Sequence, residues 1–181
     1  GGGGIFASAT DLDGTPIEDA VSAPLIINNV IAANGGYLGG GICVVDSILD
    51  AATITNNTIV ANNGSGIFWQ NTSPHINNNI VSYNTWGLEQ IENLFTDPTI
   101  IANCVYGNVL QGRPSDFKGL DDPTGMDGNI SIDPVFANSA IGDFHIQPNS
   151  PCVDSGSSAV VGTGWTDIDG QERTLNSGVD M

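Results

Sequence analysis

The sequence predicts an all-β fold in which short parallel strands stack into a coil, a β-solenoid, followed by a long loop and an irregular cap. Three observations favour it: a phrase that repeats about every two dozen residues, columns of β-branched residues within it, and an asparagine between the columns. A single repeat cannot bury its apolar side alone, so stacking supplies the core. We expect one domain over residues 1–181, with about five rungs of three short strands each.

The repeated phrase has the form Ile-x-x-Asn-x-Ile-x-x-Asn, with Val as the second apolar residue in the last two copies. The copies begin at Ile26, Ile54, Ile76 and Ile100, and their second apolar residues are Ile31, Ile59, Val81 and Val105. β-Branched residues in short runs favour strands. A third strand follows a glycine, over residues 4–7, 41–44, 66–69 and 87–90. Each rung is therefore predicted to hold three strands joined by corners.

The first asparagine of the phrase recurs at positions 29, 57, 79 and 103, in steps of 28, 22 and 24 residues. Asparagine tolerates the left-handed conformation of a tight corner, and its amide both donates and accepts hydrogen bonds. Stacked rungs would therefore bring these side chains into two internal ladders. The predicted ladders consist of Asn29, Asn57, Asn79 and Asn103, and of Asn34, Asn62, Asn84 and Asn108. We interpret them as buried corner amides rather than as a ligand site.

The remaining chain departs from the repeat. Residues 1–109 are predicted to form the regular rungs, residues 110–128 a loop that leaves the coil, and residues 129–181 the closing strands and a cap. Terminal units of stacked arrays are usually atypical in this way. The chain opens at Gly1–Ile5 in the middle of a rung, so we expect it to be a piece of a longer protein. That first rung would expose backbone groups that need partners.

The repeat resembles that of the right-handed parallel β-helix in the pectate-lyase-like superfamily. The segments 129–136, 143–156 and 167–173 resemble the C-terminal end of secreted bacterial β-helix surface proteins. The resemblance implies an extracellular or cell-surface location. It does not decide the activity, because this fold hosts lyases, hydrolases, adhesins and purely structural coils.

Charge narrows the range of partners. The chain has 3 Lys and Arg against 20 Asp and Glu, a net charge of −17. Phosphate backbones are bound by basic side chains, so nucleic acid is not an expected partner. No run of residues approaches the roughly 18 apolar residues of a membrane span. Cations, basic surfaces and neutral sugars remain the plausible partners.

Catalysis is disfavoured by the strand pattern. Glycoside hydrolases use carboxylates about 5 to 9.5 Å apart, and the resemblance implies that lyases of this fold use a basic residue. The expected outward positions of the glycine strands are Phe6, Ser8, Cys43, Val45, Phe68, Gln70, Glu89 and Ile91, with one carboxylate among them. The basic residues Arg113, Lys118 and Arg173 lie outside the repeat strands. We therefore predict a contact surface on this face, with Phe6, Val45, Phe68 and Ile91 as its apolar interface.

No cofactor is required by this interpretation, although calcium is a candidate. Asp11 and Asp13, and again Asp167 and Asp169, stand before a turn glycine. Closely spaced carboxylates suit calcium, which takes six to eight oxygen ligands. The alternative is an Asp-rich turn in which the carboxylate caps its own backbone.

The chain contains an odd number of cysteines. For Cys43, Cys104 and Cys152 we favour three buried thiols, with one disulfide and one free thiol as the alternative.

Two hypotheses of function follow. The first is a non-enzymatic extracellular structural, adhesive or self-assembling module, whose partner is a second copy, joined end to end or laterally and able to continue into a filament, or preceding rungs of a longer protein. The second is a polysaccharide lyase or glycoside hydrolase, or a glycan-binding remnant of one. It requires carboxylates to converge with Lys118 over a groove. The candidates are Asp116, Asp121, Asp122 and Asp127 in the loop, and Asp46 and Glu89 near the strands.

Overall fold

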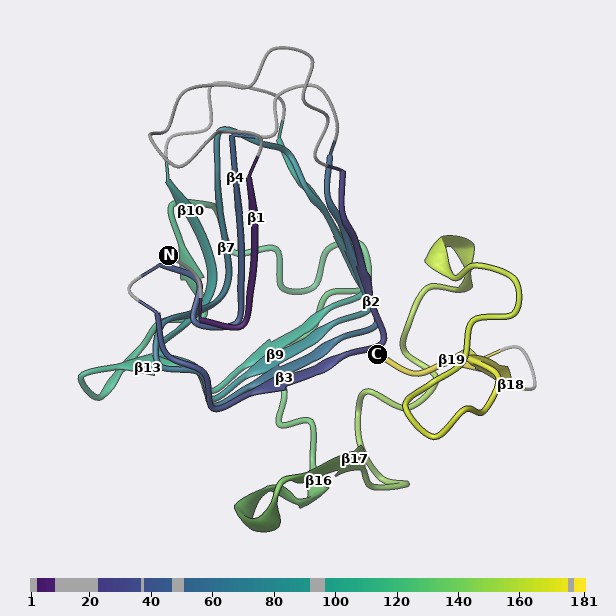
Figure 1. Cartoon of the computed structure of the whole chain (residues 1–181). Coiled ribbons are helices and arrows are strands. Elements are labelled where there is room, and N and C mark those ends of the chain that lie inside the picture. Colours follow the sequence, from purple (N-terminus) through teal and green to yellow (C-terminus); the bar gives the residue numbers. More distant parts are fainter. Residues whose placement is uncertain (1–2, 9–22, 37, 47–50, 92–96, 176–177) are drawn as a thin grey trace.

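Successive strands of the chain lie in three parallel sheets that form the sides of a coil (Figure 1). The computed structural model describes residues 3–8, 23–36, 38–46, 51–91, 97–175 and 178–181. Sheet 1 contains β1 (Ile5–Ser8), β4 (Ile42–Val45), β7 (Ser65–Gln70), β10 (Trp86–Ile91) and β15 (Phe117–Lys118). Sheet 2 contains β2 (Leu25–Ile27), β5 (Thr53–Thr55), β8 (His75–Asn77) and β11 (Thr99–Ile101). Sheet 3 contains β3 (Val30–Ala32), β6 (Thr58–Val60), β9 (Ile80–Ser82) and β12 (Cys104–Tyr106).

The predicted columns are confirmed by the strand register. Ile26, Ile54, Ile76 and Ile100 pair in sequence across sheet 2. Ile31, Ile59, Val81 and Val105 do the same across sheet 3. A parallel pair whose partners are equivalent positions of successive repeats places like beside like, which is why one apolar phrase repeated along the chain suffices to build the core.

The number of rungs is smaller than expected. Three regular turns run through β2 to β4, β5 to β7 and β8 to β10. A fourth contains β11 and β12, is interrupted by an antiparallel hairpin of β13 (Val109–Leu110) and β14 (Arg113–Pro114), and is completed by β15. Before the regular turns, the described part of the chain supplies only β1. The expected loop over 110–128 therefore contains a strand of the coil, because β15 pairs with β10 through Leu88↔Phe117 and Glu89↔Lys118.

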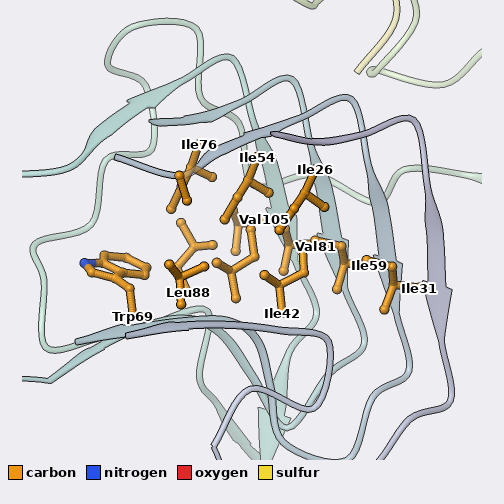
Figure 2. Packing of buried hydrophobic residues seen from close by; sticks show 13 residues of the cluster. Ile26, Ile31, Ile42, Ile54, Ile59, Trp69, Ile76, Val81, Leu88 and Val105 are labelled. Carbon is orange, nitrogen blue, oxygen red and sulfur yellow. The ribbon is translucent and has the colours of Figure 1, made fainter. Parts of the chain in front are cut away.

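Inward-facing residues of the three sheets fill the interior (Figure 2). Ile42, Ile54, Ile59 and Trp69 have no exposed surface, so Trp69 is a core residue. Replacing a buried Ile by Ala typically destabilises a protein by about 2–5 kcal/mol, because a cavity adds to the lost transfer free energy. Each position of a column therefore contributes to the stability of the coil.

The corners between the sheets differ from the prediction in which residue is left-handed. The left-handed residues are Asn28, Asn56, Asn78 and Ala102 at the first corner, and Ala33, Ala61, Tyr83 and Gly107 at the second. Each immediately precedes a ladder asparagine. The bend is therefore made one residue earlier than expected, because a ladder side chain must point into the coil. Where each turn enters sheet 1, a glycine allows the backbones of successive turns to approach closely. A Cβ on Gly41 would lie 2.4 Å from the carbonyl oxygen of Gly66.

The C-terminal third packs on the outside of sheet 3. Its elements are β16 (Phe136–Asn138), η1 (Ser139–Ile141), β17 (Asp143–Ile146), η2 (Ser158–Val160), β18 (Thr174–Leu175) and β19 (Gly178–Val179). The contact is a second apolar cluster of Ile80, Ala102, Cys104, Cys152 and Met181. We call residues 133–181 the cap. Across the described residues no helix is long and apolar enough to cross a membrane.

Candidate functional site

The two asparagine ladders run the length of the coil. Oδ1 of Asn79 accepts hydrogen bonds from both the backbone N–H and Nδ2 of Asn57, each at 3.0 Å. Nδ2 of Asn57 also donates to the carbonyl oxygen of Ile26 at 2.9 Å. The same arrangement joins Asn62 to Asn84 in the second ladder, where both bonds to Oδ1 measure 2.9 Å. Each buried ladder amide is thus hydrogen-bonded to the turns on either side, which joins every turn to the next.

Both ladders are closed at the C-terminal end of the coil. Asn103 donates to Oδ1 of Asn129, and Asn129 donates onward to the carbonyl oxygens of Ile100 and Met126. The second ladder ends on a carboxylate, because the N–H and Nδ2 of Asn108 both donate to Oδ1 of Asp116, at 3.0 and 2.8 Å. Asp116 therefore stabilises the end of this ladder through one carboxylate oxygen, and its role as a loop carboxylate in the enzyme hypothesis stays a prediction.

The N-terminal end of the coil is different. In every described turn the ladder Oδ1 accepts from the preceding turn, but for Asn29 and Asn34 the described residues supply no donor to Oδ1. Both side chains are half-buried. The strands beside them, β2 and β3, form one edge of their sheets. On the outer faces of these two strands Leu25 is 58% exposed and Val30 40% exposed. We call β2, β3, Asn29 and Asn34 the open edge.

On the outer face of sheet 1 a small polar cluster forms. Lys118 Nζ donates to one carboxylate oxygen of Glu89, and the Ser65 hydroxyl donates to the other. Lys118 Nζ also lies 4.7 Å from the centroid of the Trp86 ring. The Glu89 side chain is only 3% exposed. Both carboxylate oxygens of Glu89 are occupied and hidden, whereas the Lys118 side chain is 42% exposed. Glu89 therefore offers no accessible acid or base, and the ammonium group of Lys118 is held in an ion pair.

The predicted apolar interface on this face is wrong in part. Phe68 has no exposed surface and cannot meet a partner. Phe6 is 55% exposed, while Val45 and Ile91 are half-buried. Strand alternation correctly predicted that Phe68 faces away from the inner cluster. Its side chain is nevertheless buried on the outer face. No continuous exposed strip results from these four side chains.

The other carboxylates of the enzyme hypothesis are only partly gathered. A groove of about 730 Å³ is lined by Asp97, Asp121 and Asp127. Asp122 instead accepts a hydrogen bond from the N–H of Thr124, as in a turn. Asp46 accepts one from Asn71. Lys118 is not among the residues that line this groove.

A cavity of about 320 Å³ lies between the cap and the coil, and the predicted calcium residues Asp167 and Asp169 line it. Asp167 Oδ1 accepts the N–H groups of Asp169 and Gln171, at 2.9 and 2.8 Å. This is the Asp turn that was the alternative. Asp169 Oδ2 lies 3.0 Å from Nε2 of His145. In the described part of the chain no three His, Cys, Asp or Glu residues are placed to hold a metal, so calcium binding stays a prediction. Asp11 and Asp13 lie outside the described residues.

Two further side chains in this cavity were missed from the sequence. Arg173 donates from Nε to Asn28 Oδ1 at 2.9 Å and from Nη2 to the carbonyl oxygen of Asn56 at 3.1 Å, joining the cap to the first corner. Burial lowers the pKa of Arg173. His145 Nδ1 lies 2.6 Å from Asp143 Oδ1, and this hydrogen bond is the main reason that the pKa of His145 is raised. The sequence carried no signal for the contacts of Arg173, because Asn28 and Asn56 lie 145 and 117 positions away along the chain. Asp143 is only two positions from His145, so the sequence does place that pair side by side.

Parallel sheets with internal asparagine ladders define the parallel β-helix class. Residues 5–119 match the family described as the right-handed β-helix region, which is more than half of the chain. The protein therefore belongs to the right-handed β-helix family. Comparison with curated proteins and with solved structures finds no match.

Proposed function

We propose that the protein is a non-enzymatic structural β-solenoid of the extracellular space or cell surface, and that the open edge stacks against a further turn of the same repeat. The further turn comes from preceding rungs of a longer chain or from a second copy. The observation that supports this most is the difference between the two ends. The ladders are closed at Asn129 and Asp116, while among the described residues no donor reaches Oδ1 of Asn29 or Asn34.

The open edge has the chemistry of a stacking surface. Parallel strands at the edge of a sheet present backbone donors and acceptors that pair readily with another strand. A further turn of the repeat would bring an asparagine N–H and Nδ2 to each of Asn29 and Asn34, as Asn29 itself does for Asn57 at 3.1 and 3.0 Å. Leu25 and Val30 lie on the outer faces of β2 and β3, in the columns of Thr53 and Thr58, so a further turn would extend these columns. Recognition is therefore specific for this repeat and not for any apolar surface.

The closed end limits the assembly. The segment after β12 lies along its edge, since Val105 N–H donates to the carbonyl oxygen of Ile130 and Ala102 N–H to that of Asp127. Head-to-tail growth needs two open ends. Two copies that meet through their open edges would therefore stop as a pair, and we do not propose the filament. Such a pair could join through the backbone groups of β2 and β3, but each copy would present Oδ1 to Oδ1, because the N–H and Nδ2 of Asn29 and Asn34 already donate to Asn57 and Asn62. Preceding rungs of a longer chain, which supply the donors, are therefore the partner that fits the ladders best.

The sheet 1 face favours a structural role over catalysis. General acid or base catalysis needs a group within reach of substrate, whereas Glu89 is buried and its oxygens are held by Lys118 and Ser65. The strongly acidic, lysine-poor composition is common in secreted proteins and supports the extracellular location together with the C-terminal resemblance.

The test is the mass of the chain in solution, measured by light scattering after size exclusion over a range of concentrations. Self-association predicts a mass that rises toward twice that of the chain. The double variant Leu25→Lys, Val30→Lys places positive charge on the outer faces of β2 and β3, beside the open edge of both copies, so repulsion between the copies should hold the mass at that of one chain. Ile141→Lys is the matched control, because Ile141 is 79% exposed in the cap, and it should behave as the parent. A parent dimer that the edge variant leaves intact would contradict this interface.

A monomeric parent at every concentration would reject the second copy as the partner and leave only rungs of a longer chain, which an added turn tests separately.

Glycan binding is the second candidate function, favoured by the groove of Asp97, Asp121 and Asp127. Titration with neutral polysaccharides and with polyuronates, each with and without calcium, tests it. Binding that the triple Asp→Asn variant abolishes would support the glycan hypothesis, and no binding would remove it.

A further inference from the structure

Cys104 and Cys152 lie together where the cap meets the coil. Cys104 is on β12, and Cys152 is in the cap, 48 positions further along the chain. Both belong to the same buried cluster and have no exposed surface. Cys43, the third cysteine, is buried on β4 of sheet 1 and lies outside this cluster. Only one pair of thiols is therefore brought together by the fold.

A chain of hydrogen bonds fixes the approach of the pair. The Cys104 thiol donates to the carbonyl oxygen of Ile132 at 3.1 Å. Two residues further on, the carbonyl oxygen of Pro134 accepts from the Ser150 hydroxyl at 2.6 Å. That hydroxyl oxygen in turn accepts the N–H of Cys152 at 3.1 Å. The short segment 132–134 is thus bonded directly to Cys104 and, through Ser150, to Cys152, which fixes both cysteines in the same part of the cluster.

We propose that Cys104 and Cys152 form a disulfide that fastens the cap to the coil. In an extracellular protein, oxidising conditions make such a bond the expected state of a matched thiol pair. The inference rests on the proposed extracellular location but not on the open edge or on self-association. It revises the preference for three buried thiols in favour of one disulfide with Cys43 as the free thiol.

The oxidant is a small disulfide such as oxidised glutathione, and the reaction takes place before the cap has closed over the pair. The Cys152 thiolate attacks one sulfur of the small disulfide, which forms a mixed disulfide and releases one thiolate. Cys104 then loses its proton and attacks the Cys152 sulfur, which releases the second thiolate. The protein gives up two electrons and two protons, and one small disulfide becomes two thiols. The roles of the two cysteines can be exchanged without altering this balance.

Cys43 should not take part. Burial raises its pKa to about 11, so little thiolate exists at neutral pH. It provides an internal reference within the same molecule, because its thiol should remain countable after the other two have reacted.

The experiment refolds the full chain in a glutathione redox buffer and counts thiols after denaturation. We expect three thiols in the reduced protein and one after oxidation, with the intact mass lower by two hydrogen atoms. Peptide mapping without reductant should join the peptides of Cys104 and Cys152. Three thiols after oxidation, a bond to Cys43, or a bond between chains would overturn the proposal. These results come from the unaltered chain and do not depend on any variant folding.

Thermal unfolding gives the second measurement. A crosslink over this interval should raise the melting temperature of the oxidised protein by about 5–15 °C over the reduced one. Cys152→Ser should lose this difference, while Cys43→Ser should keep it. Equal melting temperatures for the oxidised and reduced parent would show that the bond, if formed, does not fasten the cap.

Discussion

Replacing Asn57 by Ala in the middle of the first ladder should destabilise the protein severely. Nδ2 of Asn57 donates to Ile26 O, Thr55 O and Asn79 Oδ1 at 2.9, 3.1 and 3.0 Å. Its Oδ1 accepts two bonds from Asn29. The side chain is buried, so the groups left behind have no access to water in the folded state. An unsatisfied buried donor or acceptor costs about 1–3 kcal/mol. Because Asn57→Ala leaves several such groups unsatisfied at once, we expect the free energy of unfolding to fall by about 3–4 kcal/mol.

Urea unfolding followed by circular dichroism measures this loss as a shift in midpoint. Asn63→Ala is the matched control, because Asn63 is an exposed asparagine one residue after the second ladder, and it should change stability by less than about 0.5 kcal/mol. Asn34→Ala should fall between the two, since Asn34 is half-buried at the open edge and the described residues give its Oδ1 no donor. An Asn57→Ala midpoint equal to that of Asn63→Ala would refute the ladder as the element that joins the turns.

Three further predictions concern the corner, the cap and its histidine. Gly66→Ala should lower the urea midpoint by an amount comparable to Asn57→Ala, since the new Cβ would lie 2.5 Å from a methyl group of Val81; an unchanged midpoint would mean that the corner yields easily. Arg173→Ala should make the cap more sensitive to limited proteolysis while the coil stays resistant, because both of its hydrogen bonds reach the coil; equal cleavage of the parent and variant would contradict this tether. NMR titration of His145 should give a midpoint above 6.5, and Asp143→Asn should lower it. Since the folded pKa is raised, the contribution of His145 to stability is complete below pH 6.5 and is lost as the pH rises through the folded pKa; a midpoint at or below 6.5 would refute the pairing.

The coil could be predicted from the sequence because its signals are local and repeated. Ile26 and Ile54 occupy the same position in their phrases, and parallel stacking then fixes their register without further information. The ladder asparagines were recognisable for the same reason. The left-handed corner residue was misplaced by one position because Asn28 and Asn29 are chemically identical, and only the three-dimensional path shows which of the two turns inward.

The candidate sites were less predictable because they join parts of the chain that no period relates. Asp116 ends the second ladder only because the hairpin of β13 and β14 brings it back to the coil. The pairing of Lys118 with Glu89 depends on the same return. Phe68 was expected to be exposed because strand alternation gives a direction but not the covering of that direction. The contact of Cys104 with Cys152 depends on how the cap docks on the coil, and the cap contains no repeated pattern from which this docking could be predicted.

The most direct test of the open edge is to add the missing part of a turn. A second copy of residues 53–64 joined ahead of Gly3 would place strands equivalent to β5 and β6 before β1, because Ile5, Ile42 and Ile67 are in register. Its asparagines would then donate to Asn29 and Asn34. We expect the extended chain to melt several degrees higher than the parent, since one domain gains a stacked turn. The same extension with its two ladder asparagines replaced by alanine should lose most of this gain. An extension that leaves the melting temperature unchanged, or that stabilises equally without its asparagines, would contradict the claim that this end of the coil accepts a further rung.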